Sequence, residues 1–171
     1  FLMSTGIFFS QLIAPYMAAK QGYRRCILLS LLGASLASLL IGLNKSIWII
    51  NSAYFLLGFS AGLYIPSGIS LITLLVDNRD WGKAMGIHEI APSLSLIFAP
   101  IIASVTVGFG SWRDGYLYMA IILVILWMFF AFLGGDSHER PNQPDLVVLK
   151  QIISTPSSWK TIALFSIAVG I

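Results

Sequence analysis

Five mostly apolar runs follow one another along the chain, and short polar turns separate them. The runs cover residues 1–19, 26–43, 47–76, 84–107 and 116–133. A helix needs about 20 residues to cross about 30 Å of hydrocarbon, and each run is close to that length or longer. The pattern therefore predicts an all-α membrane protein with five full transmembrane helices. A further apolar run begins near residue 159 and stops at residue 171. We expect it to be a truncated sixth helix, and the chain to be a fragment cut at both ends.

The composition indicates a membrane protein rather than a soluble domain. Hydrophobic residues make up 57% of the chain and charged residues only 10%, whereas soluble domains carry about 25% charged residues. The net charge of +3 does not indicate nucleic-acid binding, because the basic residues stand at the ends of apolar runs. Cys26 is the only cysteine, which excludes an internal disulfide or a cysteine metal cluster. We expect no metal, no cofactor and no nucleic-acid partner, and the lipid bilayer as the surroundings.

Basic residues concentrate on one predicted side of the membrane. If the five runs alternate in direction, one face holds Lys20, Arg24, Arg25, Arg79, Lys83, Arg140, Lys150 and Lys160. Only Lys45 and Arg113, of the 10 Lys and Arg residues, fall on the other face. Short loops rich in Lys and Arg stay in the cytoplasm, so the first face is predicted to be cytoplasmic. A wrong number of spans would scramble this division.

The polar segments suggest three parts of the chain. Residues 1–135 hold the five spans, residues 136–158 form a long polar cytoplasmic loop, and residues 159–171 begin another group of spans. Within the loop, apolar positions at helical spacing follow Asp145, which is a favourable N-cap residue. A short surface helix is predicted there.

Small residues and prolines recur inside the predicted spans. Faces of small residues at four-residue spacing let membrane helices approach closely. Proline frees backbone groups that neighbouring helices or a water-filled cavity must satisfy. The predicted packing and kink positions are Gly58, Gly62, Pro66, Ser95, Ala99 and Pro100.

Few polar side chains lie within the predicted spans. Glu89 lies six residues beyond Lys83, which places it about 9 Å along the helix, short of the midplane at about 15 Å. Ionisable groups at depth usually mark ion or substrate pathways. Glu89 and its neighbour His88 are therefore candidates for coupling or substrate binding, with Gln11 and Tyr64 as further candidates. A static ion pair at the cytoplasmic rim is an equal alternative for Glu89, and an interhelical hydrogen bond is the favoured alternative for Gln11.

The basic turn at residues 15–25 resembles a loop of the major facilitator transporters. Between their second and third helices, these proteins carry a Gly-x-Leu-x-Asp-Arg-x-Gly-Arg-Arg-like sequence. The matching positions here, a predicted cytoplasmic gate loop, are Lys20, Gly22, Arg24 and Arg25. The leading glycine is replaced by Pro15 and the acidic residue by Ala19. In the family, the acidic residue of this loop helps to hold the inward gate closed. With Ala19 at that position, the loop lacks the carboxylate that makes this contact.

Three further segments are similar to the family in the same order. Residues 81–86 resemble the start of the fifth helix, and residues 95–104 resemble a Gly-x-x-x-Gly-Pro-x-x-Gly-Gly motif of antiporters with small residues at the glycine positions. Residues 112–116 resemble the Trp-Arg-x-x-aromatic turn before the sixth helix. The arginine of the fourth helix would fall near Tyr54 and is missing.

The resemblance implies part of a twelve-helix fold, from the second helix to the start of the seventh. It further implies a secondary transporter of a small organic solute, with protons as the coupling ion and efflux as one direction. Such a protein would be a monomer at full length in a bacterial-type inner membrane, and not an enzyme.

Two other function classes remain as alternatives. A receptor or assembly subunit that does not transport would share the kinked spans and small-residue faces. A remote alternative is an intramembrane serine hydrolase, because Ser60 stands in a GxSxG frame. The apolar surroundings of Ser60 argue against an exposed nucleophile. The HExxH-like frame at His88 fails as a zinc site because Pro92 takes the second histidine position.

Overall fold

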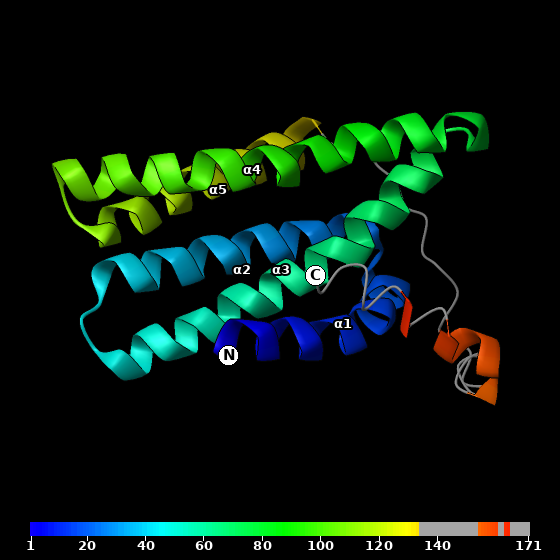
Figure 1. Cartoon of the computed structure of the whole chain (residues 1–171), viewed down its shortest axis with the longest axis horizontal. Coiled ribbons are helices and arrows are strands. Elements are labelled where there is room, and N and C mark those ends of the chain that lie inside the picture. The colour runs from blue at the N-terminus through cyan, green and yellow to red at the C-terminus, as the bar shows by residue number, and fades with distance from the viewer. Residues whose placement is uncertain (134–153, 161–162, 165–171) are drawn as a thin grey trace. The chain divides into compact units, whose positions relative to one another are not determined.

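Five long helices and one 3-10 turn form the first part of the chain, and the five helices are labelled in Figure 1. The computed structural model describes residues 1–133, 154–160 and 163–164. The helices are α1 (Leu2–Gln21), α2 (Tyr23–Leu43), α3 (Ile47–Leu75), η1 (Asn78–Asp80), α4 (Trp81–Phe109) and α5 (Trp112–Leu133). Each of the five α-helices is long and apolar enough to cross a membrane. The five predicted spans are therefore confirmed.

Three helices begin three or four residues before the apolar run that predicted them. α2, α4 and α5 start at Tyr23, Trp81 and Trp112, inside the polar turns. Aromatic and basic side chains at the end of a span can place their apolar bodies against hydrocarbon and their polar tips in water. The first turn of α4 also gains an ion pair, with Lys83 Nζ 2.7 Å from Asp80 Oδ1. Polar residues at these positions therefore extend the helices.

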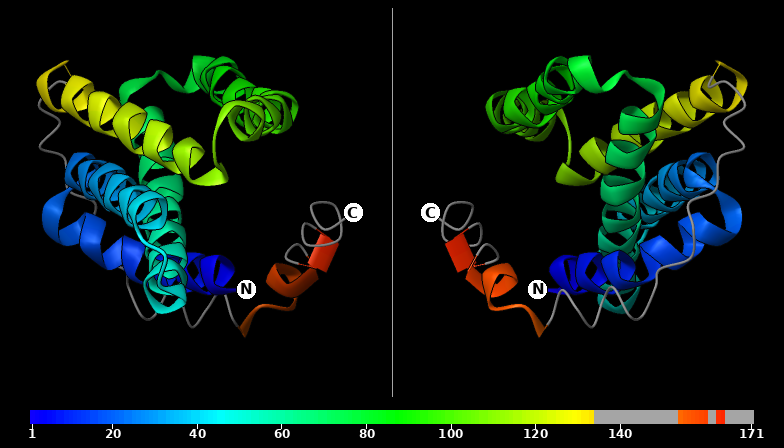
Figure 2. Two further views of the ribbon diagram at one scale, coloured as in Figure 1. Left: turned by 90° about the vertical axis from the view of Figure 1, so that its left-hand side faces the viewer. Right: turned by 90° about the vertical axis from the view of Figure 1, so that its right-hand side faces the viewer.

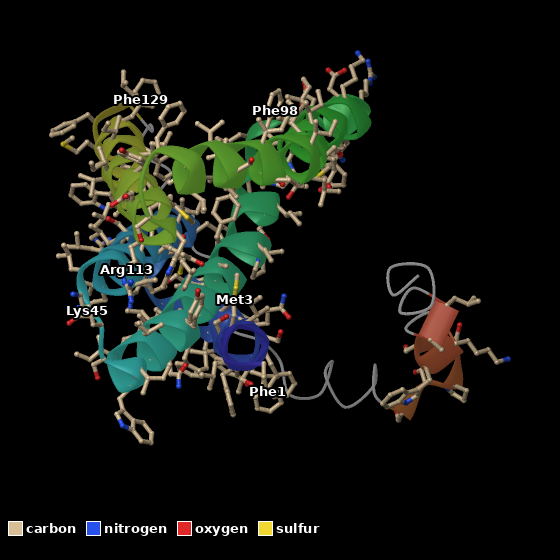
Figure 3. All side chains as sticks on the ribbon, turned by 60° about the vertical axis from the view of Figure 1, so that its left-hand side comes forward. Phe1, Met3, Lys45, Phe98, Arg113 and Phe129 are labelled. Carbon is tan, nitrogen blue, oxygen red and sulfur yellow. The ribbon has the colours of Figure 1, made fainter. Side chains whose placement is uncertain are left out.

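The turns alternate between the two ends of the bundle, as the predicted sidedness requires. In Figure 1 the α2–α3 and α4–α5 turns lie at one end, and the α1–α2 and α3–α4 turns lie at the other. Lys45 and Arg113, which are labelled in Figure 3, belong to the first end. This arrangement separates them from the basic residues of the α1–α2 and α3–α4 turns.

Glycines bring α1 and α3 into close contact. The buried residues of α1 are Gly6, Ser10, Ala14 and Ala18, one small-residue stripe. A Cβ atom at Gly58 would meet the backbone of Met3, and one at Gly62 would lie 2.7 Å from the Ile7 carbonyl oxygen. The two helices therefore pack backbone to backbone over more than one turn, which supports the predicted GxxxG face.

The second tight pair, α2 and α5, packs antiparallel in one register. The Arg24 guanidinium donates a hydrogen bond to the Ala131 carbonyl oxygen (2.8 Å), and the Ser35 hydroxyl donates to the Ala120 carbonyl oxygen (3.1 Å). Both steps along the helices cover eleven residues, which is close to three turns, so the two bonds lie on one stripe of each helix. Gly42 continues this stripe against the first turn of α5. One face of α5 therefore packs on α2.

Between the two pairs, α2 and α3 form the central core. Ala37 and Ile41 of α2 are buried against Ala53 and Leu57 of α3. Towards the end that holds the α1–α2 turn, Cys26 is buried with Ala14, Ala18 and Leu63 in a second cluster. Most of the described core therefore belongs to the first three helices.

α4 lies at the edge of this arrangement (Figure 2). None of its residues is buried within the described part of the chain. Its small residues Ser95 and Ala99, and Pro100 after them, are exposed there, so no described helix packs on the face they were predicted to form. Phe98 is likewise exposed on α4 (Figure 3).

The chain divides into two compact units, Phe1–Pro141 and Asn142–Ile171. In the second unit, residues 156–160 and 163–164 are helical. The predicted loop helix after Asp145, and the basic residues Arg140 and Lys150, lie outside the described residues.

Candidate functional site

The structure brings three of the candidate site residues together. The rings of Tyr64 on α3 and His88 on α4 are stacked, with centroids 6.5 Å apart and planes inclined by 17°. His88 Nδ1 lies 3.3 Å from Glu89 Oε1, a long hydrogen bond between neighbours on the same helix. The His88 side chain is 20% exposed and that of Glu89 is 65% exposed. The histidine is therefore held against α3 while the carboxylate stays open.

Local sequence explains the position of Tyr64. Pro66 lies two residues further along α3, within the helix. Gly68 lies one turn beyond Tyr64, and a Cβ atom at that position would approach the tyrosine ring to 3.3 Å. A larger residue at Gly68 would therefore crowd the ring that stacks on His88.

Gln11 is not part of this group. It is exposed on α1, next to the buried stripe that contains Ser10. Among the described residues, no hydrogen bond or ring contact joins it to Tyr64, His88 or Glu89. The predicted set of four thus separates into a cluster of three and a lone amide.

The residues of the basic turn between α1 and α2 differ in their contacts: some shape or anchor the turn, and others are exposed. Gly22 has φ 85° and ψ 157°, a backbone conformation that favours glycine. Its N–H group donates to the Ala18 carbonyl oxygen at 2.7 Å and so ends α1. Arg24 binds the last turn of α5, whereas Lys20 and Arg25 are exposed. Only part of the predicted gate loop therefore presents its charge to the surroundings.

Ser60 does not resemble a hydrolase nucleophile. It is buried in the middle of α3, and its hydroxyl lies where a Cβ atom of Gly33 would point. A nucleophile elbow instead places its serine at an exposed turn between a strand and a helix. The described geometry therefore gives the GxSxG frame a packing role.

The comparison with known families decides the identity of the fold. A model of the Major Facilitator Superfamily matches residues 1–171, the whole chain. The chain belongs to the Major Facilitator Superfamily. Five apolar helices and this match confirm the predicted multi-pass integral membrane protein and its all-α fold.

Three proteins with similar sequences are named transporters or resistance proteins. The uncharacterized transporter YebQ of Escherichia coli is 28% identical over 80% of this chain and 30% of its own length. The probable sulfoacetate transporter SauU of Cupriavidus necator is 23% identical over 83% of this chain and 33% of its own. The multidrug resistance protein MdtG of Klebsiella pneumoniae is 22% identical over 94% of this chain and 40% of its own. The chain therefore spans about a third of the length of these relatives.

Several site features of this superfamily member could not be seen in the sequence. The hydroxyls of Tyr54 and Tyr116 lie 2.9 Å apart and join α3 to α5. Trp112 meets the Tyr116 ring edge to face, and the Arg113 guanidinium lies 4.5 Å from the centre of the Trp112 ring. The resemblance pointed to Tyr54 only as the place of a missing arginine. In the sequence, the only indication of the hydrogen bond between positions 54 and 116 is that both are tyrosine.

Proposed function

We propose that the intact protein is a secondary active transporter of a small organic solute, coupled to protons and working by alternating access. The observation that carries the proposal is Glu89, an open carboxylate on a membrane-spanning helix beside the His88–Tyr64 stack. Ionisable groups inside spans usually face an ion or substrate pathway. Membership of the superfamily and the transporter names of the relatives support the same function.

The surroundings of Glu89 favour a proton-binding role over a static ion pair. The basic residues available for such a pair at the predicted cytoplasmic rim are Lys83, Arg24 and Arg25. Lys83 instead pairs with Asp80 at 2.7 Å, and Arg24 donates to a carbonyl of α5. Arg25, the third, is exposed at the start of α2. In the described part of the chain the partner of Glu89 is His88, and not one of these three cations.

The position of α4 supports a moving role for its carboxylate. The helix contributes no buried residue to the described core, and its His88 ring stacks on Tyr64 of α3. Pro92 and Pro100 interrupt its backbone bonding beyond Glu89. Alternating access rocks or gates one group of helices against another around a fixed binding site, and helices interrupted by proline are typical of such sites.

The relatives bear on the class of solute, and an antiporter-like segment bears on the direction of transport. The relatives are named for sulfoacetate and for multidrug resistance, which are different solute classes. Efflux of an organic solute is the direction that the resemblance of residues 95–104 to an antiporter motif supports. A receptor or assembly subunit is the competing function, and a transport assay separates it from our proposal.

The test uses the intact protein in proteoliposomes with a pH-sensitive dye inside. Sulfoacetate and ethidium are two probes of opposite charge, and we expect one of them to drive proton movement. Glu89→Gln keeps the shape and hydrogen bonding of the side chain but removes its titratable group. We expect this variant to lose proton-driven accumulation while it retains solute exchange.

Asp77→Asn is the matched control, because it removes a carboxylate from the turn between α3 and η1. Normal pH-dependent accumulation by Glu89→Gln would contradict the coupling role. Absence of both exchange and proton movement in the wild type, with these and further solutes, would favour the receptor function.

A further inference from the structure

An open apolar groove runs along the seam between α2 and α5. Its volume is about 350 Å³. The lining residues come from one stripe of each helix and are Ser35, Leu39, Ala120, Ile121, Val124, Ile125 and Met128. Ser35, the polar member, already donates its hydroxyl hydrogen to the Ala120 carbonyl oxygen. The groove therefore presents hydrocarbon surface and suits an apolar occupant.

Exposed leucines on α2 extend this surface. Leu29, Leu32, Leu36 and Leu39 recur at three- and four-residue spacing, which places them on one face of the helix. Each of them is more than 40% exposed. On α5, Phe129 continues the exposed apolar surface beyond the groove (Figure 3). The face is apolar along most of one side of the helix pair.

A cation stands at the end of the leucine face. Arg25 is exposed, and it lies seven residues before Leu32 and fourteen before Leu39, so all three share one face of α2. The distance from Arg25 to the level of Ser35 is about 15 Å along the helix, which equals the depth of one leaflet. Arg24 is already bound to α5, so Arg25 is the exposed guanidinium of the pair.

We propose that this seam is a binding site for a phospholipid with an anionic headgroup. One acyl chain lies in the groove between α2 and α5 and along the leucines, and Arg25 binds the headgroup phosphate. The match of charge and depth selects the occupant, because an acyl chain that hangs from a headgroup at Arg25 ends near Ser35. Basic residues beside clefts between spanning helices are a known arrangement for anionic headgroups.

Native mass spectrometry of the intact protein tests the proposal. The purified protein is delipidated and then mixed with equal amounts of phosphatidylglycerol and phosphatidylethanolamine that carry the same acyl chains. We expect phosphatidylglycerol to be retained preferentially. Arg25→Gln should lower this preference about fivefold, the contribution of one basic residue near a membrane surface. Lys45→Gln, which removes an exposed cation at the opposite end, should leave the preference unchanged.

A second pair of variants tests the groove itself. Val124→Trp places a bulky ring in the groove and should reduce retention of both lipids. Ile122→Trp is its matched control, because Ile122 is exposed on α5 and does not line the groove. Arg25→Gln keeps the proposal testable if Val124→Trp fails to fold, since Arg25 is exposed.

Three results would overturn the proposal. They are equal retention of the two lipids by the wild type, equal effects of Arg25→Gln and Lys45→Gln, and equal effects of Val124→Trp and Ile122→Trp. A mass of two protein copies that Val124→Trp abolishes would instead assign the groove to a second copy of the protein. Lipid retention needs no transported solute, so these outcomes are independent of the proposed transport function.

Discussion

Gly62→Leu should separate α1 from α3 and destabilise the protein. A Cβ atom at Gly62 would lie 2.7 Å from the carbonyl oxygen and 2.9 Å from the Cα atom of Ile7, and it would also meet the Ser10 hydroxyl. The hydroxyl can rotate, but the backbone atoms of Ile7 cannot move without the helix. Substitution therefore requires the two helices to move apart, and not merely a rotamer change.

The size of the effect follows from these distances. Ordinary contact of a Cβ atom begins at 3.4 Å, so even alanine at Gly62 requires the Ile7 oxygen to retreat by 0.7 Å. Overpacking of this kind costs about 1–3 kcal/mol. Replacement of glycine by alanine within a helix returns up to about 1 kcal/mol, so we expect Gly62→Ala to cost about 0–2 kcal/mol. Leucine adds three further carbon atoms to the same space and should cost about 3 kcal/mol or more.

Thermal unfolding in detergent measures the difference. Cys26 is fully buried, so its reaction with a fluorogenic thiol reagent reports unfolding when Cys26 is the sole cysteine of the intact protein. Gly86→Leu and Gly86→Ala are matched controls, because nothing lies within 4 Å of a Cβ atom at Gly86. The midpoint of Gly62→Leu should fall well below that of Gly86→Leu. Equal midpoints and equal yields would refute the reasoning and place this face of α3 against lipid.

Two further predictions concern the basic turn. Arg24→Gln should lower the thermal midpoint more than Arg25→Gln does, because Arg24, unlike the exposed Arg25, donates a hydrogen bond to the last turn of α5. Hydrogen bonds of charged groups contribute about 1.5–3 kcal/mol to stability. Equal midpoints would contradict a stabilising role for that bond. Sidedness cannot be tested on Cys26, since burial protects it from thiol reagents on both sides of the membrane. With Cys26 replaced by serine, an impermeant thiol reagent should label Lys45→Cys in intact cells and Lys20→Cys only in inside-out vesicles, and rapid labelling of Lys20→Cys from outside would overturn the topology.

The sequence was sufficient for the number, order and approximate ends of the helices. Runs of apolar residues must span the bilayer as helices, because no water is present there to satisfy the backbone. The GxxxG spacing at Gly58 likewise predicts a close helix contact, since glycine lets the backbones of two helices approach each other. The sequence pattern predicts loops at the first turns of α2, α4 and α5, because polar residues at a membrane surface are compatible with both conformations.

Contacts between distant segments could not be obtained from periodicity. Arg24 and Ala131 are 107 residues apart, and nothing in either local sequence specifies the partner. The stacking of His88 on Tyr64 depends on the relative rotation of α3 and α4, which the spacing within each helix leaves open. Ser95 and Ala99 carry a pattern typical of a helix contact, yet the described chain offers them no neighbouring helix. A small-residue stripe specifies that a close approach is possible, and not which helix makes it.

The described helices differ in how firmly they are fixed, and this difference bears on the transport proposal. α1 and α3 meet through glycine, where any larger side chain collides with backbone. α2 and α5 are joined by side chains that donate to backbone carbonyls three turns apart, so a slip by one turn would break both bonds. α4 contributes no buried residue, and its contacts with α3 include the Tyr64–His88 ring stack and the hydrogen bonds that the Trp81 indole donates to the Thr73 and Val76 carbonyl oxygens. The helix that carries His88 and Glu89 thus has the fewest contacts among the described residues, and our transport proposal places the proton-binding group on it.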